Sequence, residues 1–281
     1  MRDPRVPESL EGWWILHRMF RFDRLLWESV GEKRRAKIAS RTCDLFEHMH
    51  AGEDGDIGLT QLVGHKGDLM LTHYARSYDG LAYAQMLVDK TDLRFFLEPM
   101  DSYVSVLEIG MYDATGKIHA DLAARGLEPG GEEWVRAFDE ALASQAISPY
   151  IAPRLWAKIP RRRYTCFYPM DKRRGENANW YMTPFEERRK MMHEHGLIGR
   201  TYAGKLTQVI SGSIGYDDFE WGVDLYADDP LVFKKIVYEM RFDEASAKYG
   251  EFGSFWSGVQ FSPTQLGVFL DGESVPGLVA E

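Results

Sequence analysis

The order of strands and helices repeats once along the chain, and this repeat limits the possible folds more than any other feature. Apolar residues alternate, or recur at helical spacing, in a pattern that predicts strands at 13–22, 59–63, 67–75 and 103–111. Helices are predicted between them at 24–50 and 79–90. The first half of the chain therefore has the order β-α-β-β-α-β.

The second half has the same order. Strands are predicted at 163–168, 205–213, 221–227 and 255–261, with one helix at 183–195 and another within 229–246. This order is that of the ferredoxin-like unit. Two such units can pair their open sheets into one barrel, which leaves no exposed strand edge. We therefore expect an α+β fold with an N-terminal unit at 1–113, a connector at 114–153 containing a helix at 132–143, and a C-terminal unit at 154–281.

Charge is spread unevenly along the chain. The whole chain carries a formal net charge of −9, whereas residues 154–174 hold eight Lys or Arg and one Asp. Such a stretch indicates either a local anionic ligand or a solvated basic face beside acidic neighbours, and both interpretations stay open. The acidic total argues against a general nucleic-acid binder.

Three further features predict a cytoplasmic protein. No apolar run approaches the ~20 residues of a membrane span, and the first twelve residues contain no apolar signal core. The two cysteines, Cys43 and Cys166, make neither a disulfide framework nor a cysteine zinc site.

The predicted helix at 183–195 has the clearest local pattern. Thr183 can cap it, Pro184 suits its first position, Glu186 completes a capping box and Gly196 can end it. His195 shares a face with Phe185 and Met192, whereas His193 points to the other side. An inward histidine is either a satisfied core residue or a ligand, because haem iron needs only one protein imidazole.

Three stretches of the chain resemble the coproheme decarboxylases of the chlorite dismutase-like superfamily. They are YPMDKRR at 168–174, NWYMTPFEERRKMMHEHGLIGRTYAGK at 179–205 and YEMRFDEASAKYGEFGSF at 238–255. The resemblance is dense from 154 to 261 and looser before it. It implies two ferredoxin-like units per subunit, a homopentamer and a haem site in the C-terminal half. The implied reaction uses hydrogen peroxide to convert two propionates of iron coproporphyrin III (coproheme) to vinyls, which gives haem b.

The resemblance also assigns roles to residues. His195 matches the axial iron ligand, Tyr168 the radical-forming tyrosine and Lys172 the lysine needed for the second decarboxylation. Positions that contact the substrate match Arg154, Tyr168, Pro169, Met170, Asp171, Lys172, Gln208 and Ser246. The enzyme that inserts iron into coproporphyrin is an implied transient partner.

Two other functions stay open: a chlorite- or peroxide-consuming haem enzyme of the same superfamily, and a haem carrier or sensor without turnover. Gln208 argues against the first, because true chlorite dismutases have a distal arginine at the matching position. The pair of Tyr168 and Lys172 argues against the second, because a carrier needs neither residue.

Overall fold

The computed structural model describes residues 6–279; residues 1–5 and 280–281, which include the outer limits of the predicted first and last domains, lie outside the described part. The strands are β1 (Ser9–Phe22), β2 (Gly55–Leu62), β3 (Leu69–Ala75), β4 (Leu97–Gly110), β5 (Tyr164–Lys172), β6 (Leu206–Gly212), β7 (Trp221–Ala227), β8 (Gly250–Phe252) and β9 (Trp256–Phe261). The α-helices are α1 (Arg24–Ser29), α2 (Glu32–Met49), α3 (Tyr78–Asp89), α4 (Tyr112–Ala124), α5 (Glu132–Ala146), α6 (Ala152–Leu155), α7 (Phe185–Thr201), α8 (Leu231–Met240), α9 (Glu244–Tyr249) and α10 (Leu266–Asp271). Short 3-10 helices are η1 (Asp92–Phe96), η2 (Trp180–Met182) and η3 (Pro263–Gln265).

Hydrogen bonds join the strands into one nine-stranded sheet that closes on itself. The order is β7-β6-β4-β1-β3-β2-β9-β5-β8, and a further pairing of β5 with β7 completes the ring. Within this ring, β4-β1-β3-β2 and β6-β7-β5-β9 are the two β-α-β-β-α-β units. The predicted α+β fold of two ferredoxin-like units sharing one barrel is confirmed.

The two units meet at two seams. Residues 106–107 of β4 pair with 211–212 of β6, and residues 59–62 of β2 pair with 258–261 of β9. Gly258 permits the second seam, since a Cβ there would lie 2.1 Å from the carbonyl oxygen of Gln61. Each edge left open by one unit is thus hydrogen-bonded by the other.

Alternate residues of β1 fill the barrel interior. Trp13 and Ile15 are fully buried, and Met19 is 1% exposed. His17, on the same face, is also fully buried, and its Nε2 lies 2.9 Å from Oδ1 of Asp224 on β7. A buried polar group needs such a partner, so this contact ties the first unit to the second through the core.

Several predicted boundaries were wrong. The helix predicted at 24–50 is broken into α1 and α2, because Val30 between them is extended. Strand β5 runs on to Lys172, and β4 begins at Leu97. The predicted connector contains α5 as expected, but it also contains most of α4 and the first two residues of α6.

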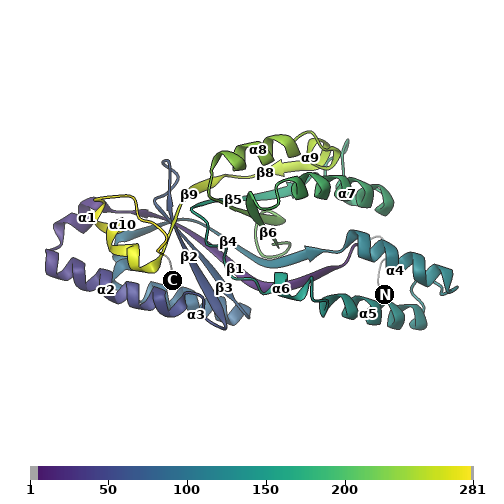
Figure 1. Cartoon of the computed structure of the whole chain (residues 1–281), viewed down its shortest axis with the longest axis horizontal. Helices are drawn as coiled ribbons and strands as arrows, with labels where there is room; N and C mark the ends of the chain where they lie inside the picture. The colour runs from purple at the N-terminus through teal and green to yellow at the C-terminus, as the bar shows by residue number, and fades with distance from the viewer. Residues whose placement is uncertain (1–5, 280–281) are drawn as a thin grey trace.

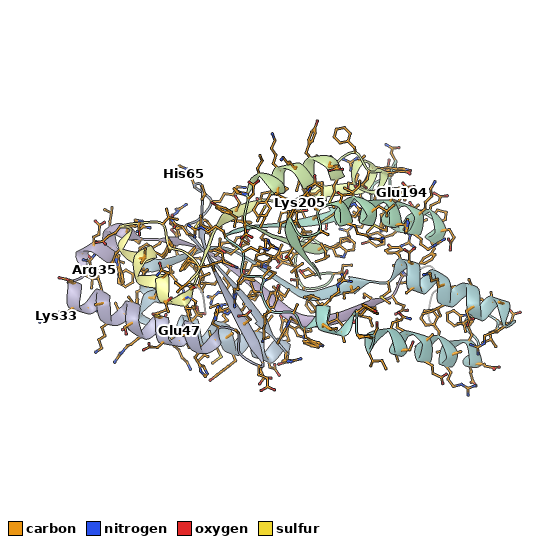
Figure 2. All side chains as sticks on the ribbon, viewed as in Figure 1. Lys33, Arg35, Glu47, His65, Glu194 and Lys205 are labelled. Carbon is orange, nitrogen blue, oxygen red and sulfur yellow. The ribbon has the colours of Figure 1, made fainter. Side chains whose placement is uncertain are left out.

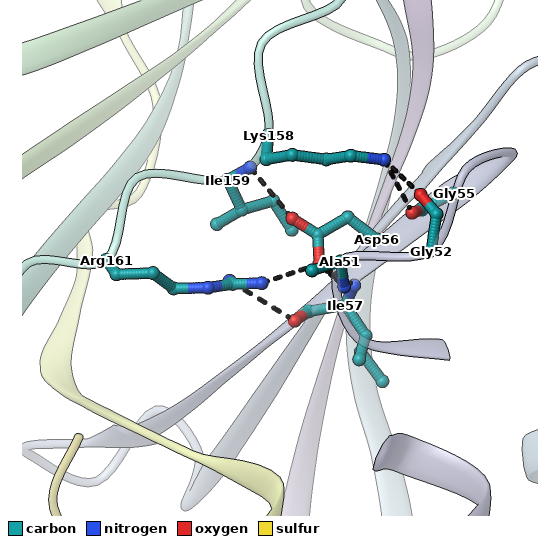
Figure 3. A network of polar contacts seen from close by, with 8 residues as sticks. All are labelled: Ala51, Gly52, Gly55, Asp56, Ile57, Lys158, Ile159 and Arg161. Atoms are coloured by element: carbon teal, nitrogen blue, oxygen red, sulfur yellow. Dashed lines mark hydrogen bonds and ion pairs between the residues drawn. The ribbon is translucent and has the colours of Figure 1, made fainter. Parts of the chain in front are cut away.

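A buried carboxylate fixes the end of the connector to the first unit (Figure 3). Asp56, at the start of β2, accepts hydrogen bonds from the amides of Ala51, Ile57 and Ile159 and from Arg161 Nη2. Its side chain is fully buried, whereas that of Arg161 is 28% exposed. Lys158 adds hydrogen bonds to the carbonyls of Gly52 and Gly55. The entry into β5 is therefore anchored to the turn that precedes β2.

Figure 1 shows α2 and α10 at one end of the long axis and the α4–α5 hairpin at the other. Helices α7, α8 and α9 lie together over the strands of the second unit. Within residues 6–279, no helix is long and apolar enough to cross a membrane.

Candidate active site

Strand β5 divides the predicted motif between two faces. Tyr168 belongs to the apolar cluster that includes residues of α8, and Met170 packs against that cluster. Lys172 reaches α9, where its Nζ donates to the carbonyl oxygen of Ala245 at 3.2 Å. Because side chains alternate along a strand, these three residues share the face beneath α7–α9.

The other two motif residues point away from that face. The Asp171 carboxylate accepts the amide N–H of Glu220 at 2.7 Å. Pro169 pairs with Gly222 in β7, and its ring lies against Gly253. Their side chains brace the strand from the opposite side of the sheet, so any contact with a ligand under α7–α9 falls to Tyr168, Met170 and Lys172.

Tyr168 is held among aromatic rings. It is 4% exposed, its ring stacks on Phe255 with centroids 4.5 Å apart, and the ring of Phe252 is tilted against it with centroids 5.8 Å apart. Burial raises the pKa of the phenol well above its usual value; Cys166 adds to this effect and Arg241 opposes it. The hydroxyl has no hydrogen-bonding partner among the described residues, so its proton is available to a ligand.

Lys172 is a buried cation without a carboxylate partner in the described part of the chain. The residue is 6% exposed, and its Nζ lies 4.9 Å from the centre of the Trp180 ring. Burial lowers the pKa of its amine to about 8, although Asp243 acts in the opposite direction. A lysine of this kind attracts an anion and can exchange a proton near neutral pH.

His195 on α7 is oriented by Asp243. Its Nδ1 donates to Oδ2 of Asp243 at 3.0 Å, and Ser246 Oγ donates to the same oxygen at 3.0 Å. Burial tends to raise the pKa of Asp243, but the hydrogen bonds from His195 and Ser246 outweigh it and lower the pKa. Nε2 makes no hydrogen bond to any residue between 6 and 279. A carboxylate–imidazole pair with one free ring nitrogen is the usual arrangement of a metal-binding histidine.

About one turn after His195, helix α7 carries a glycine, Gly199, which has no side chain. A Cβ built on Gly199 would lie 3.6 Å from Met240 Cε and 3.9 Å from Oε1 of Gln208, which belongs to β6. Gln208 therefore faces the helix that carries His195. Neither Gly196 nor Gly199 of this helix carries a side chain toward Gln208. In residues 6–279 no cluster of three or more His, Cys, Asp or Glu side chains could hold a metal ion.

The structure corrects two predictions about α7. Thr183 is not the cap, since Pro184 precedes the first turn and the Thr183 hydroxyl donates to the Asn179 carbonyl instead. Gly196 does not end the helix, which continues to Thr201. The expected orientation of the histidines is found: the side chain of His195 is 24% exposed and that of His193 is 48% exposed, with His193 paired to Asp113.

Most of the basic residues at 154–174 are not at this site. Arg161, Arg162, Arg173 and Arg174 pair with Asp56, Asp228, Glu251 and Glu220 respectively. Arg154 is exposed on α6, which packs on β1 and β4. Of the cations in this segment, the structure brings Lys172 to the face beneath α7–α9 and leaves Arg154 on another element.

Arg241 is a cation that sequence reasoning missed. It follows α8, is exposed, and its guanidinium carbon lies 4.7 Å from the centre of the Phe252 ring. Phe252 in turn contacts Tyr168. No ion pair engages Arg241 within the described residues, so it can serve an anionic ligand. Arg241 lies in the YEMRFDEAS stretch, two residues before Asp243, and this position could have indicated it as a candidate site residue.

Known proteins resemble this chain over most of its length. A family model described as chlorite dismutase matches residues 35–261. A coproheme decarboxylase of Staphylococcus saprophyticus is 42% identical over 261 residues, which cover 91% of this chain and 94% of that protein. A protein of Haloquadratum walsbyi, whose name assigns it heme binding only provisionally, is 41% identical over 96% of this chain. The chain spans about half the length of that relative, since the match covers 48% of it.

Solved structures extend the comparison. A novel heme-binding protein from Thermus thermophilus has a TM-score of 0.81 and 36% identity, with 96% of this chain and 100% of that chain covered. A mutant chlorite dismutase from Candidatus Nitrospira defluvii has a TM-score of 0.68 at 18% identity, with 94% and 96% covered, which is a likeness of fold alone.

The closed two-unit barrel is the fold of the chlorite dismutases. The chain belongs to the chlorite dismutase family. Within that family it is similar over nearly its whole length to a coproheme decarboxylase.

Proposed function

We propose that this protein is a coproheme decarboxylase, which uses hydrogen peroxide to convert two propionates of iron coproporphyrin III to vinyls and so forms haem b. The observation that carries this proposal is the shared face of β5. It presents an oxidisable phenol, Tyr168, and a buried cation, Lys172, to the layer that holds the free nitrogen of His195.

The residues fit an anionic porphyrin. Nε2 of His195 would ligate the iron, and the Asp243 carboxylate would keep the imidazole oriented. Lys172 and Arg241 would attract propionates, since both are cations without an ion-pair partner among the described residues. Gln208 would offer an amide to a propionate or to peroxide, and Ser246 would support the ligand histidine.

The reaction balances for each propionate. One propionate, one hydrogen peroxide and one proton give one vinyl group, one carbon dioxide and two waters. Bound coproheme would supply the iron at which peroxide is reduced. Tyr168 would give up the hydrogen atom of its hydroxyl and then take one from the β-carbon of the propionate. The propionate radical would then pass its second electron to the centre that peroxide has oxidised, and the bond to the carboxylate would break to give carbon dioxide and the vinyl.

The experiment is a peroxide titration of the coproheme-loaded protein, followed by mass spectrometry of the porphyrin. Successive loss of two carboxyl groups as carbon dioxide supports the proposal. An unchanged porphyrin with a stable haem spectrum would instead indicate a carrier or sensor. Chlorite consumption without porphyrin modification would indicate chlorite chemistry.

Assembly and location are part of the same proposal. By similarity to its relatives, we propose a cytoplasmic homopentamer that receives coproheme from the enzyme inserting the iron. Sedimentation velocity of the ligand-free protein measures the number of subunits directly.

A further inference from the structure

The turn between β8 and β9 carries the aromatic rings that surround Tyr168. Phe255 stacks on Tyr168 with an interplanar angle of 26°, and Phe252 lies on the near side of the same turn, 6.3 Å from Phe255. Of these two rings, Phe255 is the closer to the phenol. The position of this turn therefore controls the orientation of the phenol.

One side of the turn is fixed to β5. The amide of Gly253 donates to the carbonyl oxygen of Pro169 at 2.8 Å. A Cβ on Gly253 would lie 2.7 Å from Pro169 Cγ and 2.8 Å from Phe219 Cζ, so only glycine permits this approach. The turn is thus pressed against the strand that holds Tyr168, one residue away from it.

The other side is held from the first unit. Nζ of Lys66, in the turn between β2 and β3, donates to the carbonyl oxygen of Phe255 at 2.8 Å, across 189 residues of sequence. Figure 2 shows the adjacent residue, His65, at the tip of a projecting turn on the same side of the molecule as Lys205 and Glu194 of the second unit. Lys66 also lies 6.0 Å from the Trp256 ring. A residue of the N-terminal unit therefore reaches the backbone of the residue stacked on Tyr168.

We propose that Phe255 is a positioning residue for Tyr168 and that Lys66 holds Phe255 in place. The stacked ring restricts rotation of the phenol and keeps water from its face. Hydrogen transfer requires a near-contact geometry, so a phenol that can turn away reacts more slowly and loses its radical to solvent. This inference rests on the proposed function for its catalytic consequence, but the positioning itself is a property of the ligand-free protein.

Two variants test it, each with a matched control. Phe255→Leu removes the ring and keeps an apolar side chain, and Lys66→Met keeps the stem and removes the ammonium. Their controls are Phe95→Leu, at a residue 77% exposed in η1, and Lys33→Met on the exposed side of α2. Circular dichroism confirms folding. If Phe255→Leu does not fold, the surface change Lys66→Met still decides the question.

The first measurement needs no porphyrin. Tyrosines are replaced by 3-fluorotyrosine, and the ¹⁹F signal of residue 168 is identified by its absence in Tyr168→Phe. We expect this signal to shift in Phe255→Leu, because the ring current is lost, and to shift or broaden in Lys66→Met. Both controls should leave it unchanged. An unchanged signal in both test variants would overturn the proposal.

The second measurement uses coproheme-loaded protein. Freeze-quenched samples after peroxide addition should show a tyrosyl radical whose hyperfine pattern, set by the side-chain dihedral, differs in Phe255→Leu. The rate of decarboxylation should fall by roughly tenfold or more in that variant and less in Lys66→Met. A wild-type protein that does not decarboxylate coproheme would refute the proposed function, yet the ¹⁹F result would still stand or fall by itself.

Discussion

Nδ1 of His195 donates to Oδ2 of Asp243 at 3.0 Å, and Oδ1 of the same carboxylate caps α9 by accepting the amide of Ser246 at 2.9 Å. One side chain thus fixes both the imidazole on α7 and the start of α9. The remaining ring nitrogen is left free to bind a metal.

His195→Ala should lose the imidazole-bound iron spectrum of the coproheme-loaded protein, because Nε2 is the proposed ligand atom. His193→Ala is the matched control, since His193 lies two residues away and pairs with Asp113 at 3.0 Å. Absorbance and resonance Raman spectra measure the effect. Loss of the signal in His193→Ala rather than in His195→Ala would reverse the assignment.

Asp243→Asn should weaken the ligand without removing it. Asparagine can still cap α9, but it cannot supply the negative charge beside Nδ1. We expect about a tenfold loss of affinity for coproheme and a lower iron–histidine stretching frequency, as for other partners of ligating histidines. An unchanged frequency would mean that the carboxylate serves only as a helix cap.

Tyr168→Phe and Lys172→Ala should fail at different stages. The first removes the oxidisable hydroxyl but keeps the ring, so coproheme binds and neither propionate leaves. The second removes one cation, so we expect a three-propionate intermediate to accumulate. Stepwise peroxide addition with porphyrin mass spectrometry separates the two outcomes. Haem b formation at the wild-type rate in Tyr168→Phe would move the radical to another residue.

Lys172 should also affect how the free energy of unfolding depends on pH. Its pKa falls from 10.5 in the unfolded chain to about 8 in the folded protein, because the amine is buried. The unfolded chain therefore binds more protons between these values, and the contribution of Lys172 to the free energy of unfolding rises as pH rises from 8 to 10.5. Urea denaturation of the ligand-free protein should show wild type gaining up to about 3 kcal/mol relative to Lys172→Met across this range. A difference independent of pH would contradict the lowered pKa.

Asp56→Ala should destabilise the fold more than any surface ion-pair variant. It leaves the buried amides of Ile57 and Ile159 without their acceptor and Arg161 without its carboxylate. We expect a loss of about 3 kcal/mol in the free energy of unfolding, measured in urea. Asp228→Ala, at an ion pair whose acid is 64% exposed, is the control and should cost no more than about 1 kcal/mol.

The sequence predicted the order of elements because alternation and helical spacing survive in the buried faces. It missed the extent of β5, since Pro169 and Asp171 disfavour strands locally. Pairing with β7 and β8 overrides that preference. Helix α7 passes Gly196 for a similar reason, since packing of Ile198 against the apolar cluster that contains Met240 outweighs the local stop signal.

The candidate site was predicted only through resemblance. Spacing placed His195 on an inward face, but nothing in the spacing linked it to Asp243, 48 residues away, or Lys66 to Phe255. Such contacts depend on how the two units close, which no local pattern encodes. Asp243 and Arg241 lie within the stretch 238–255 that carries the resemblance, so they could have been proposed as site residues. Lys66 lies outside every such stretch, and no sequence pattern indicated its role.

The barrel closes only when β2 pairs with β9 and β4 pairs with β6, so neither unit alone has a closed sheet. If the chain were divided in the turn between α4 and α5 and expressed as two polypeptides, each would have unpaired strands at the edges of its sheet. Each would tend to self-associate when made alone, and each would find its proper complement when both are made together. The topology thus repeats within each unit, while cooperative folding requires both units together.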